Sequence, residues 1–152
     1  MKTNIPSIRE YAPNDKSALL QLLDLNTPTY FAPAERTDFE SYLDHEVELY
    51  YVVTFENRIV GCGGINFETD KSIGIISWDI IHPDYQGKAL GSLLLKHRLS
   101  VLKTLDTKSK IIVRTSQLTH LFYQKHGFVL KDKIVDYWAP GFDLYFMEHQ
   151  EL

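Results

Sequence analysis

A near-continuous apolar segment that leads into a glycine-containing loop constrains the fold of this chain most strongly. Residues 73–82 are rich in isoleucine and end at Pro83, which has no backbone N–H to donate. Such a segment is typical of a strand buried on both faces in the middle of a sheet. After the loop, leucines at helical spacing predict a helix over residues 89–105. This order of strand, loop and helix indicates an α/β unit on a mixed sheet.

The remaining segments predict the order β-α-α-β-β-β-α-β-α-β-β. We expect further strands at residues 5–11, 49–55, 58–67, 111–115, 128–137 and 144–148, and further helices from the turn at residues 13–15 to residue 25, at 35–43 and at 118–126. Asn14 or Asp15 could cap the first helix, and Gly127 suits a left-handed cap. Since no linker, repeat or low-complexity segment divides the chain, we expect residues 1–152 to form a single domain.

Composition excludes several classes of protein. The chain has 152 residues, 44% hydrophobic and 24% charged, which is typical of an ordinary globular domain. A net charge of -4 with scattered basic residues disfavours a nucleic-acid partner and mildly favours an amine substrate. Cys62 is the single cysteine, so no internal disulfide can form, and we interpret it as a packing residue rather than a reactive thiol. Without an apolar run of membrane-spanning length or a signal peptide, we expect a cytoplasmic protein with no membrane partner.

The loop after the buried strand is a candidate anion site. It places Gly87 and Gly91 at the start of a helix, where unpaired N–H groups and the positive end of the helix dipole meet. Small residues there allow a phosphate group to approach the backbone. The loop lacks the pattern of a P-loop, and no Gly-x-Gly-x-x-Gly follows the first strand. From the residues alone, a phosphate-containing ligand and a purely structural turn both remain open.

Two motifs resemble landmarks of the GCN5-related N-acetyltransferase (GNAT) superfamily. Residues 86–91 resemble the acetyl-CoA motif Gln/Arg-x-x-Gly-x-Gly/Ala, with Gln86 in the first slot and Gly91 in the last. Ala89 replaces the usual middle glycine, and we expect a tighter loop there rather than a lost site. Residues 122–128 resemble the second landmark, Phe-Tyr-x-x-x-Gly-Phe. Both motifs stand in the family's order, and the resemblance covers nearly the whole chain.

The resemblance implies a GNAT fold: a mixed, mostly antiparallel sheet of six to seven strands, flanked by about four helices, with a splay between strands 4 and 5. It implies acetyl-CoA as cosubstrate and no metal. The pantetheine arm would lie in the splay, with backbone contacts from Ile81. The backbone N–H groups of the loop would hold the diphosphate, which makes Gln86, Gly87, Lys88, Ala89, Leu90, Gly91 and Ser92 candidate cofactor-binding residues.

Acetyl transfer needs a neutral amine and a proton for the departing thiolate. The resemblance places the Tyr123 hydroxyl near the coenzyme sulfur as general acid. Asp79, on the buried strand, is a candidate general base, and by the two-residue strand period it would share a face with residues 77 and 81. The alternatives are that Asp79 is a structural acid paired with a basic neighbour, or that His82 or a water is the base. His120 lies near Tyr123 in sequence, but its side chain could face outward.

The acceptor end is less determined. Many relatives carry an asparagine at the end of the fifth strand, where this chain has Ser116 in the slot and Gln117 as the nearest amide. We assign Ser116 to the cofactor site. Relatives usually form acceptor pockets from segments that correspond here to residues 27–36 and 136–142. The aromatic pair at residues 137–138 could cover an amine, close the sheet or form a dimer surface.

The sequence therefore predicts an acetyl-CoA-dependent N-acetyltransferase. The expected acceptor is a primary amine, on a small molecule or a protein N-terminus, that attacks directly in a ternary complex. A homodimer is possible from the sequence. Two alternatives remain: a degenerate relative that binds acyl-CoA as a sensor or interaction module, and a nucleotide-binding regulator.

Overall fold

The chain folds into one seven-stranded mixed sheet with helices on both faces. The computed structural model describes residues 5–68, 70–105 and 110–150. The strands are β1 (Ser7–Glu10), β2 (Leu49–Phe55), β3 (Arg58–Glu68), β4 (Ile73–Ile81), β5 (Lys110–Thr115), β6 (Phe128–Ala139) and β7 (Phe142–His149). The helices are α1 (Lys16–Leu25), α2 (Glu35–His45), α3 (Leu90–Lys103) and α4 (His120–Lys125), with short 3₁₀ helices η1 (Pro13–Asp15) and η2 (Pro83–Tyr85). This sequence of elements confirms the predicted order.

Strand order in the sheet is β1-β2-β3-β4-β5-β7-β6, and β4 with β5 is the parallel pair among otherwise antiparallel neighbours. Both predicted hairpin turns form: Glu56 and Asn57 adopt positive φ between β2 and β3, and Gly141 does so between β6 and β7. Gly127, with φ +93°, ends α4 as expected. The mixed, mostly antiparallel sheet expected for the fold is therefore confirmed.

Several predicted boundaries were wrong by a few residues. β1 is shorter than residues 5–11, α4 begins two residues later than predicted, and β7 extends beyond residues 144–148 at both ends. Asp15 does not cap the first turn of α1. Its carboxylate instead accepts a hydrogen bond from the Ala12 N–H and pairs with Arg9, so it stabilises the preceding 3₁₀ turn.

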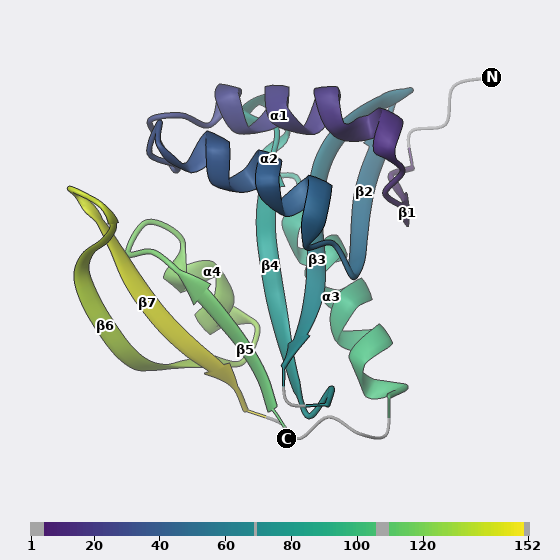
Figure 1. The fold of residues 1–152 in the computed structure, drawn as a ribbon. Coiled ribbons are helices and arrows are strands. Elements are labelled where there is room, and N and C mark those ends of the chain that lie inside the picture. Colours follow the sequence, from purple (N-terminus) through teal and green to yellow (C-terminus); the bar gives the residue numbers. More distant parts are fainter. Residues whose placement is uncertain (1–4, 69, 106–109, 151–152) are drawn as a thin grey trace.

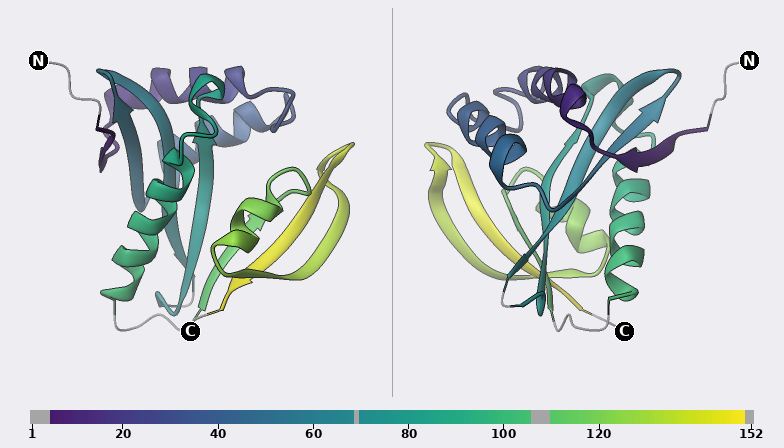
Figure 2. Two further views of the ribbon diagram at one scale, coloured as in Figure 1. Left: turned by 180° about the vertical axis from the view of Figure 1, so that it is seen from behind. Right: turned by 45° about the vertical axis from the view of Figure 1, so that its right-hand side comes forward.

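Helices cover the two faces of β2–β4 unequally. α1 and α2 lie together on one face, while α3 lies on the other, as the front and rear views show (Figures 1 and 2). The core between α1, α2 and the sheet is formed by buried leucines and aromatic rings, together with Cys62, which is fully buried. The core under α3 contains Leu94, Leu95 and Leu102. Burial of each such leucine contributes about 1.5–3 kcal/mol to the free energy of folding. The burial of Cys62 agrees with its interpretation as a packing residue.

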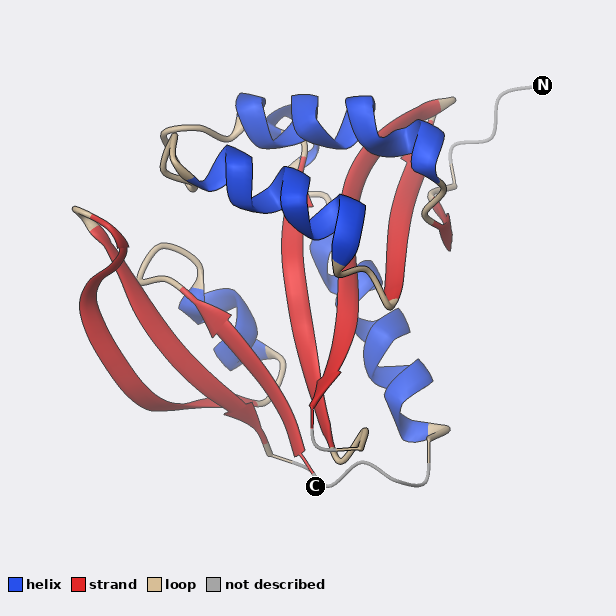
Figure 3. Ribbon diagram, in the orientation of Figure 1, coloured by secondary structure: helices blue, strands red, loops and turns tan. Residues whose placement is uncertain are grey.

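β4 and β5 pair over only part of their length. Their ladder joins residues 73–76 of β4 to residues 110–113 of β5, after which the two strands diverge. Figure 3 shows the consequence: strands β5, β7 and β6 form a separate leaf that leaves the plane of β1–β4. The predicted splay is thus present. It also explains why β4 is only half buried toward its end, which the expectation of a strand buried on both faces missed.

A β-bulge interrupts β4 beside the splay. Ser77 pairs with Gly64 and Ile80 with Cys62, so two residues of β4 stand opposite Gly63. Trp78, with φ +48°, occupies the bulge and packs with the α1–α2 core. Because the bulge breaks the two-residue period, the prediction that residue 77 shares a face with Asp79 was wrong. The Ser77 hydroxyl lies on the α2 side, in hydrogen-bonding contact with Tyr42, whose pKa is raised by burial.

Candidate active site

A cavity of about 1220 Å³ opens at the splay. Its walls come from β4, the loop before α3, the end of β5, α4 and α2. The cavity brings together almost all of the predicted site residues, namely Asp79, Ile81, Gln86, Gly87, Ala89, Leu90, Gly91, Ser92, Ser116 and Tyr123. Lys88 is exposed and is not among the residues that line it. The candidate cofactor and catalytic residues therefore face one continuous space.

The loop before α3 presents small, exposed residues to this cavity. Gly87 has φ +78° and Ala89, which directly precedes α3, has φ +64°. The left-handed φ of residue 89 explains why the motif that this loop resembles usually has glycine there. An alanine in this conformation costs about 1 kcal/mol of folding free energy. A Cβ built on Gly91 would lie 3.3 Å from the Phe122 ring, so glycine at 91 allows α3 to pack against α4. The N–H groups in the first turn of α3 thus lie next to an open loop, which leaves space for an anion to reach them.

Gln86 binds the end of α1. Its Nε2 donates to Asn26 Oδ1 at 3.1 Å and to the Ile81 carbonyl at 3.2 Å. Asn26 Nδ2 donates to the same carbonyl at 3.1 Å. The His82 N–H bonds to Val60 across β3, so the polar backbone groups of Ile81 face away from β3, toward the splay. Sequence reasoning missed Asn26, which is 2% exposed; its place just after a leucine-rich helix suggested no more than a helix end.

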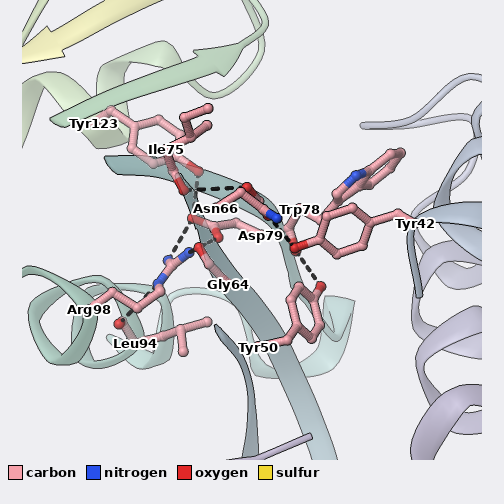
Figure 4. Close-up of polar contacts among 11 residues, drawn as sticks. Tyr42, Tyr50, Gly64, Asn66, Ile75, Trp78, Asp79, Leu94, Arg98 and Tyr123 are labelled. Carbon is pink, nitrogen blue, oxygen red and sulfur yellow. Dashed lines mark hydrogen bonds and ion pairs between the residues drawn. The ribbon is translucent and has the colours of Figure 1, made fainter. Parts of the chain in front are cut away.

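Tyr123, Asp79 and Arg98 form a polar cluster at the base of the splay (Figure 4). The Tyr123 hydroxyl donates to Asp79 Oδ2 at 2.6 Å. Arg98 of α3 forms a two-pronged ion pair with Asp79, through Nη1 to Oδ1 and through Nη2 to Oδ2 at 2.8 Å. Arg98 also donates to the Gly64 carbonyl at 3.1 Å. The geometry is that of an acid paired with a basic neighbour. Sequence reasoning did not identify Arg98, whose place on the buried face of a leucine-rich helix was its one signal.

Burial controls the electrostatics of this cluster. Arg98 is 0% exposed and Tyr123 is 5% exposed. Burial, together with the charge of Asp79, raises the pKa of Tyr123 well above its usual value. Burial alone would lower the pKa of Arg98, but the charge and hydrogen bonds of Asp79 outweigh it and raise that pKa. The cluster therefore holds a protonated tyrosine beside an ion pair.

The other candidates for catalysis have structural partners. His82 Nδ1 accepts the Asp84 N–H and so caps η2, and His82 is not among the residues lining the cavity. His120 Nδ1 contacts the Gln117 carbonyl at 3.1 Å. The Gln117 amide is engaged with the β6–β7 turn, donating to Gly141 and accepting from the Asp143 N–H. Ser116, 8% exposed, lines the cavity and accepts a bond from the Leu118 N–H.

Aromatic and acidic side chains from α2, β3 and the β6–β7 turn also line the cavity. Phe31 and Trp78 stack at 6.1 Å, and the Tyr42 hydroxyl donates to Asn66 Oδ1 at 2.5 Å. Trp138 closes the opposite side and donates from Nε1 to the Thr115 carbonyl at 3.2 Å. Further lining residues are Tyr30, Glu35, Glu46, Glu48 and Phe142. Both segments expected to form the acceptor pocket, residues 27–36 and 136–142, thus contribute side chains.

Within residues 5–68, 70–105 and 110–150, no group of three or more His, Cys, Asp or Glu side chains could hold a metal ion. Across the same ranges, no helix combines the length and the apolar character needed to cross a membrane.

Comparison with known proteins identifies the family. The family described as Acetyltransferase (GNAT) domain matches residues 46–130, more than half of the chain. The match includes β4, the loop before α3 and the Tyr123 segment. The chain therefore belongs to the GNAT acetyltransferase family.

Similar curated proteins carry the name amino-acid acetyltransferase. That of Buchnera aphidicola is 33% identical over 90 residues, which is 59% of this chain and 20% of the relative. That of Shewanella oneidensis is 31% identical over 91 residues, with the same coverage of 59% and 20%. The chain thus spans about a fifth of the length of these relatives.

Solved structures share the fold at low identity. The ribosomal-protein-S18-alanine N-acetyltransferase from Escherichia coli has a TM-score of 0.79 at 17% identity, covering 95% of this chain and 93% of that one. The GNAT-family acetyltransferase from Streptococcus pneumoniae has a TM-score of 0.73 at 22% identity, covering 95% and 98%. An aminoglycoside 6'-N-acetyltransferase complexed with coenzyme A has a TM-score of 0.75 at 12% identity, covering 93% and 95%. These likenesses show the GNAT fold.

Proposed function

We propose that this protein is an acetyl-CoA-dependent N-acetyltransferase that acetylates a primary amine by direct attack in a ternary complex. The observation that carries the proposal is the single cavity that joins the loop before α3 to the Tyr123 hydroxyl. Membership of the GNAT family supports it. Cys62, the single cysteine, is buried, which fits a reducing compartment, and the cytoplasm is part of the proposal.

The residues present fit a diphosphate carrier. A Cβ built on Gly87 would meet nothing within 4 Å, so the loop has open space beside its backbone. In the proposal, backbone N–H groups from Gln86 to Ser92 hold the diphosphate, and the backbone N–H of Ile81 contacts the pantetheine arm, because the Ile81 carbonyl already accepts from Gln86 and Asn26. Ser116, at the end of β5, lines the opposite wall. When bound, acetyl-CoA supplies the activated acetyl group.

Tyr123 is the proposed proton donor. The amine nitrogen forms the new N–C bond, the C–S bond breaks, and the departing sulfur takes a proton from the Tyr123 hydroxyl. The proton lost from the nitrogen passes to solvent, and solvent returns one to the tyrosine. Because Asp79 already accepts three hydrogen bonds from Arg98 and Tyr123, we assign the removal of the amine proton to water. The proposed role of Asp79 is instead to accept the hydrogen bond of the Tyr123 hydroxyl and so orient it.

The acceptor is proposed to enter between the α1–α2 connection and the β6–β7 turn. Aromatic rings and the carboxylates of Glu46 and Glu48 line this half of the cavity, which suits a cationic amine before it loses its proton. A small molecule and a protein N-terminus both present such a group. The names of the similar proteins include amino-acid and ribosomal-protein acetyltransferases, so both classes belong in the test.

The proposal is tested by measuring free-thiol release from acetyl-CoA across amines, amino acids and peptides, with acetylated product detected by mass spectrometry. We expect turnover on at least one primary amine, and its loss in Tyr123→Phe. The protein is an acyl-CoA sensor if coenzyme A binds tightly, no acceptor is turned over, and Tyr123→Phe changes neither the binding nor the thiol release. Stabilisation against heat by ATP rather than by coenzyme A would favour a nucleotide-binding regulator.

A further inference from the structure

Arg98 is a fully buried charge in a helix that otherwise packs through leucines. It lies in the middle of α3 at 0% exposure, among Leu94, Leu95 and Leu102. A buried ion pair is often no more stabilising than apolar residues of similar volume, because both charges must leave water. Its guanidinium leaves the α3 core and reaches Asp79 at the cavity wall. Because stability alone does not account for such a pair, its position at the cavity suggests a role at the site.

Two features of the sheet make room for this ion pair. The β4 bulge turns Asp79 toward α3, with Trp78 held at φ +48°. On β3, a Cβ built on Gly63 would lie 2.5 Å from Asp79 Oδ1 and 2.9 Å from Arg98 Nη1. A side chain at position 63 would therefore displace the pair. The bulge at Trp78 and the glycine at position 63 thus both leave space for the ion pair between Arg98 and Asp79.

We propose that Arg98 is a positioning residue for acetyl transfer: it fixes the ionised Asp79 carboxylate, and this carboxylate holds the Tyr123 hydroxyl in its donating form. The inference rests on the proposed function of Tyr123. Asp79 Oδ2 accepts both Arg98 Nη2 at 2.8 Å and the tyrosine hydroxyl at 2.6 Å. The planar guanidinium engages both carboxylate oxygens and so fixes their plane. The acceptor of the hydroxyl is thereby held in place.

The groups around Asp79 indicate that Arg98 is the residue that fixes its carboxylate. Asp79 contacts Arg98 of α3 and Tyr123 of α4, and its charge also acts on Tyr50 of β2 and Cys62 of β3 across the sheet. Burial raises the pKa of Tyr50 and of Cys62, so both are neutral near pH 7. Among the residues that the structure describes, Arg98 is the cation that pairs with Asp79. Without it, the half-buried carboxylate would lose its paired cation and the two hydrogen bonds that fix its plane.

The two members of the pair have opposite effects on Tyr123. The charge of Asp79 raises the pKa of Tyr123, whereas the charge of Arg98 lowers it. Asp79→Asn therefore leaves Arg98 to favour tyrosinate, and kcat should fall at high pH. Arg98→Met instead removes the charge that lowers the pKa of Tyr123, so the fall of kcat at high pH should begin at a higher pH than in the wild type. A merely structural loss would lower stability without moving the pH profile in opposite directions.

The experiment measures kcat at saturating acetyl-CoA and acceptor over roughly pH 6 to pH 10 for the wild type, Asp79→Asn, Arg98→Met, Arg98→Lys and Gly63→Ala. Coenzyme A binding, measured by calorimetry, shows which variants keep the cofactor site. Arg9→Met is the matched control, because Arg9 makes a similar two-pronged pair with Asp15 far from the cavity. Gly74→Ala is the control for Gly63, since its Cβ would meet only the Leu102 side chain.

We expect Arg98→Met and Gly63→Ala to lower kcat by about 100-fold with unchanged coenzyme A affinity, Arg98→Lys to recover part of it, and the controls to keep wild-type kcat. The fall of kcat at high pH should begin at a lower pH in Asp79→Asn and at a higher pH in Arg98→Met than in the wild type. Variants of Asp79, Arg98 and Gly63 that bind coenzyme A yet keep the wild-type kcat and profile would overturn the inference. Should Arg98→Met not fold, Asp79→Asn and Gly63→Ala still decide.

A second readout separates this inference from the proposed function. Tyrosine isotope-labelled at Cζ reports hydroxyl ionisation by NMR, with the Tyr123 resonance assigned through Tyr123→Phe. We expect its titration to begin at lower pH in Asp79→Asn than in the wild type. A wild type without turnover but with this shift would refute the proposed acetyltransferase activity and retain the coupling of Asp79 to Tyr123. An unchanged Tyr123 titration in Asp79→Asn would refute the inference, whatever the turnover.

Discussion

Gln86 of the loop and Asn26 at the end of α1 are joined by a hydrogen bond of 3.1 Å from Gln86 Nε2 to Asn26 Oδ1. Both amides also donate to the Ile81 carbonyl, so three separate segments meet at one backbone oxygen. The side chain of the first residue of the acetyl-CoA motif is thus used inside the protein. It fixes the loop and the end of β4 relative to α1.

Asn26→Ala tests this connection. We expect a loss of about 1–3 kcal/mol in unfolding free energy, because the change leaves buried groups such as the Leu22 carbonyl without their partner. The KM for acetyl-CoA should rise, since the loop loses its contact with α1. Urea unfolding and initial rates check the two effects. Gln21→Ala, on the exposed face of the same helix, is the control and should change neither.

Tyr123→Phe removes only the hydroxyl that donates to Asp79. We expect kcat to fall by about 100-fold to 10,000-fold, the range typical of a lost general acid, while the KM for acetyl-CoA stays the same. Steady-state kinetics with both substrates varied makes the distinction. Tyr11→Phe, at a tyrosine that does not line the cavity, is the matched control. Equal kcat in wild type and Tyr123→Phe would remove Tyr123 from the mechanism.

Ala89→Val tests the left-handed residue before α3. A β-branched residue resists φ +64° and adds bulk beside the proposed diphosphate position. We therefore expect weaker coenzyme A binding and a lower Tm. Ala89→Gly, which relieves the backbone, should retain or improve both. Calorimetric titration with coenzyme A measures the effect, and equal affinity in all three proteins would argue against a ligand at this loop.

Asp15 gives a prediction for stability against pH. Its hydrogen bond with Arg9 lowers the pKa of Asp15 below the usual value of an aspartate. A lowered pKa in the folded state means that this contribution is present above the unfolded pKa and is lost as the pH falls through the folded one. Tm should therefore fall on acidification below about pH 4, and Asp15→Asn should show a smaller fall. Identical slopes of Tm against pH would contradict this.

Sequence reasoning worked best where a signal is local. The isoleucine-rich β4, the leucine spacing of α3, the turn at residues 56–57 and the cap at Gly127 all carry their structure in neighbouring residues. The resemblance of two motifs supplied the splay, which local patterns cannot show because it depends on where β4 and β5 stop pairing.

Long-range contacts account for what sequence reasoning missed. Arg98 and Asp79 are 19 residues apart, and Gln86 and Asn26 are 60 apart. No periodicity links residues at such separations. The bulge at Trp78 was also not predicted, because a tryptophan at positive φ follows no local rule, and it reversed the expected face of Ser77.

A crystal structure with coenzyme A tests the central claim most directly. It should show the diphosphate on the backbone N–H groups between Gln86 and Ser92, and the sulfur within hydrogen-bonding reach of the Tyr123 hydroxyl. Coenzyme A bound elsewhere, with its sulfur remote from Tyr123 and the loop contacting solvent alone, would contradict the assigned site and its chemistry together.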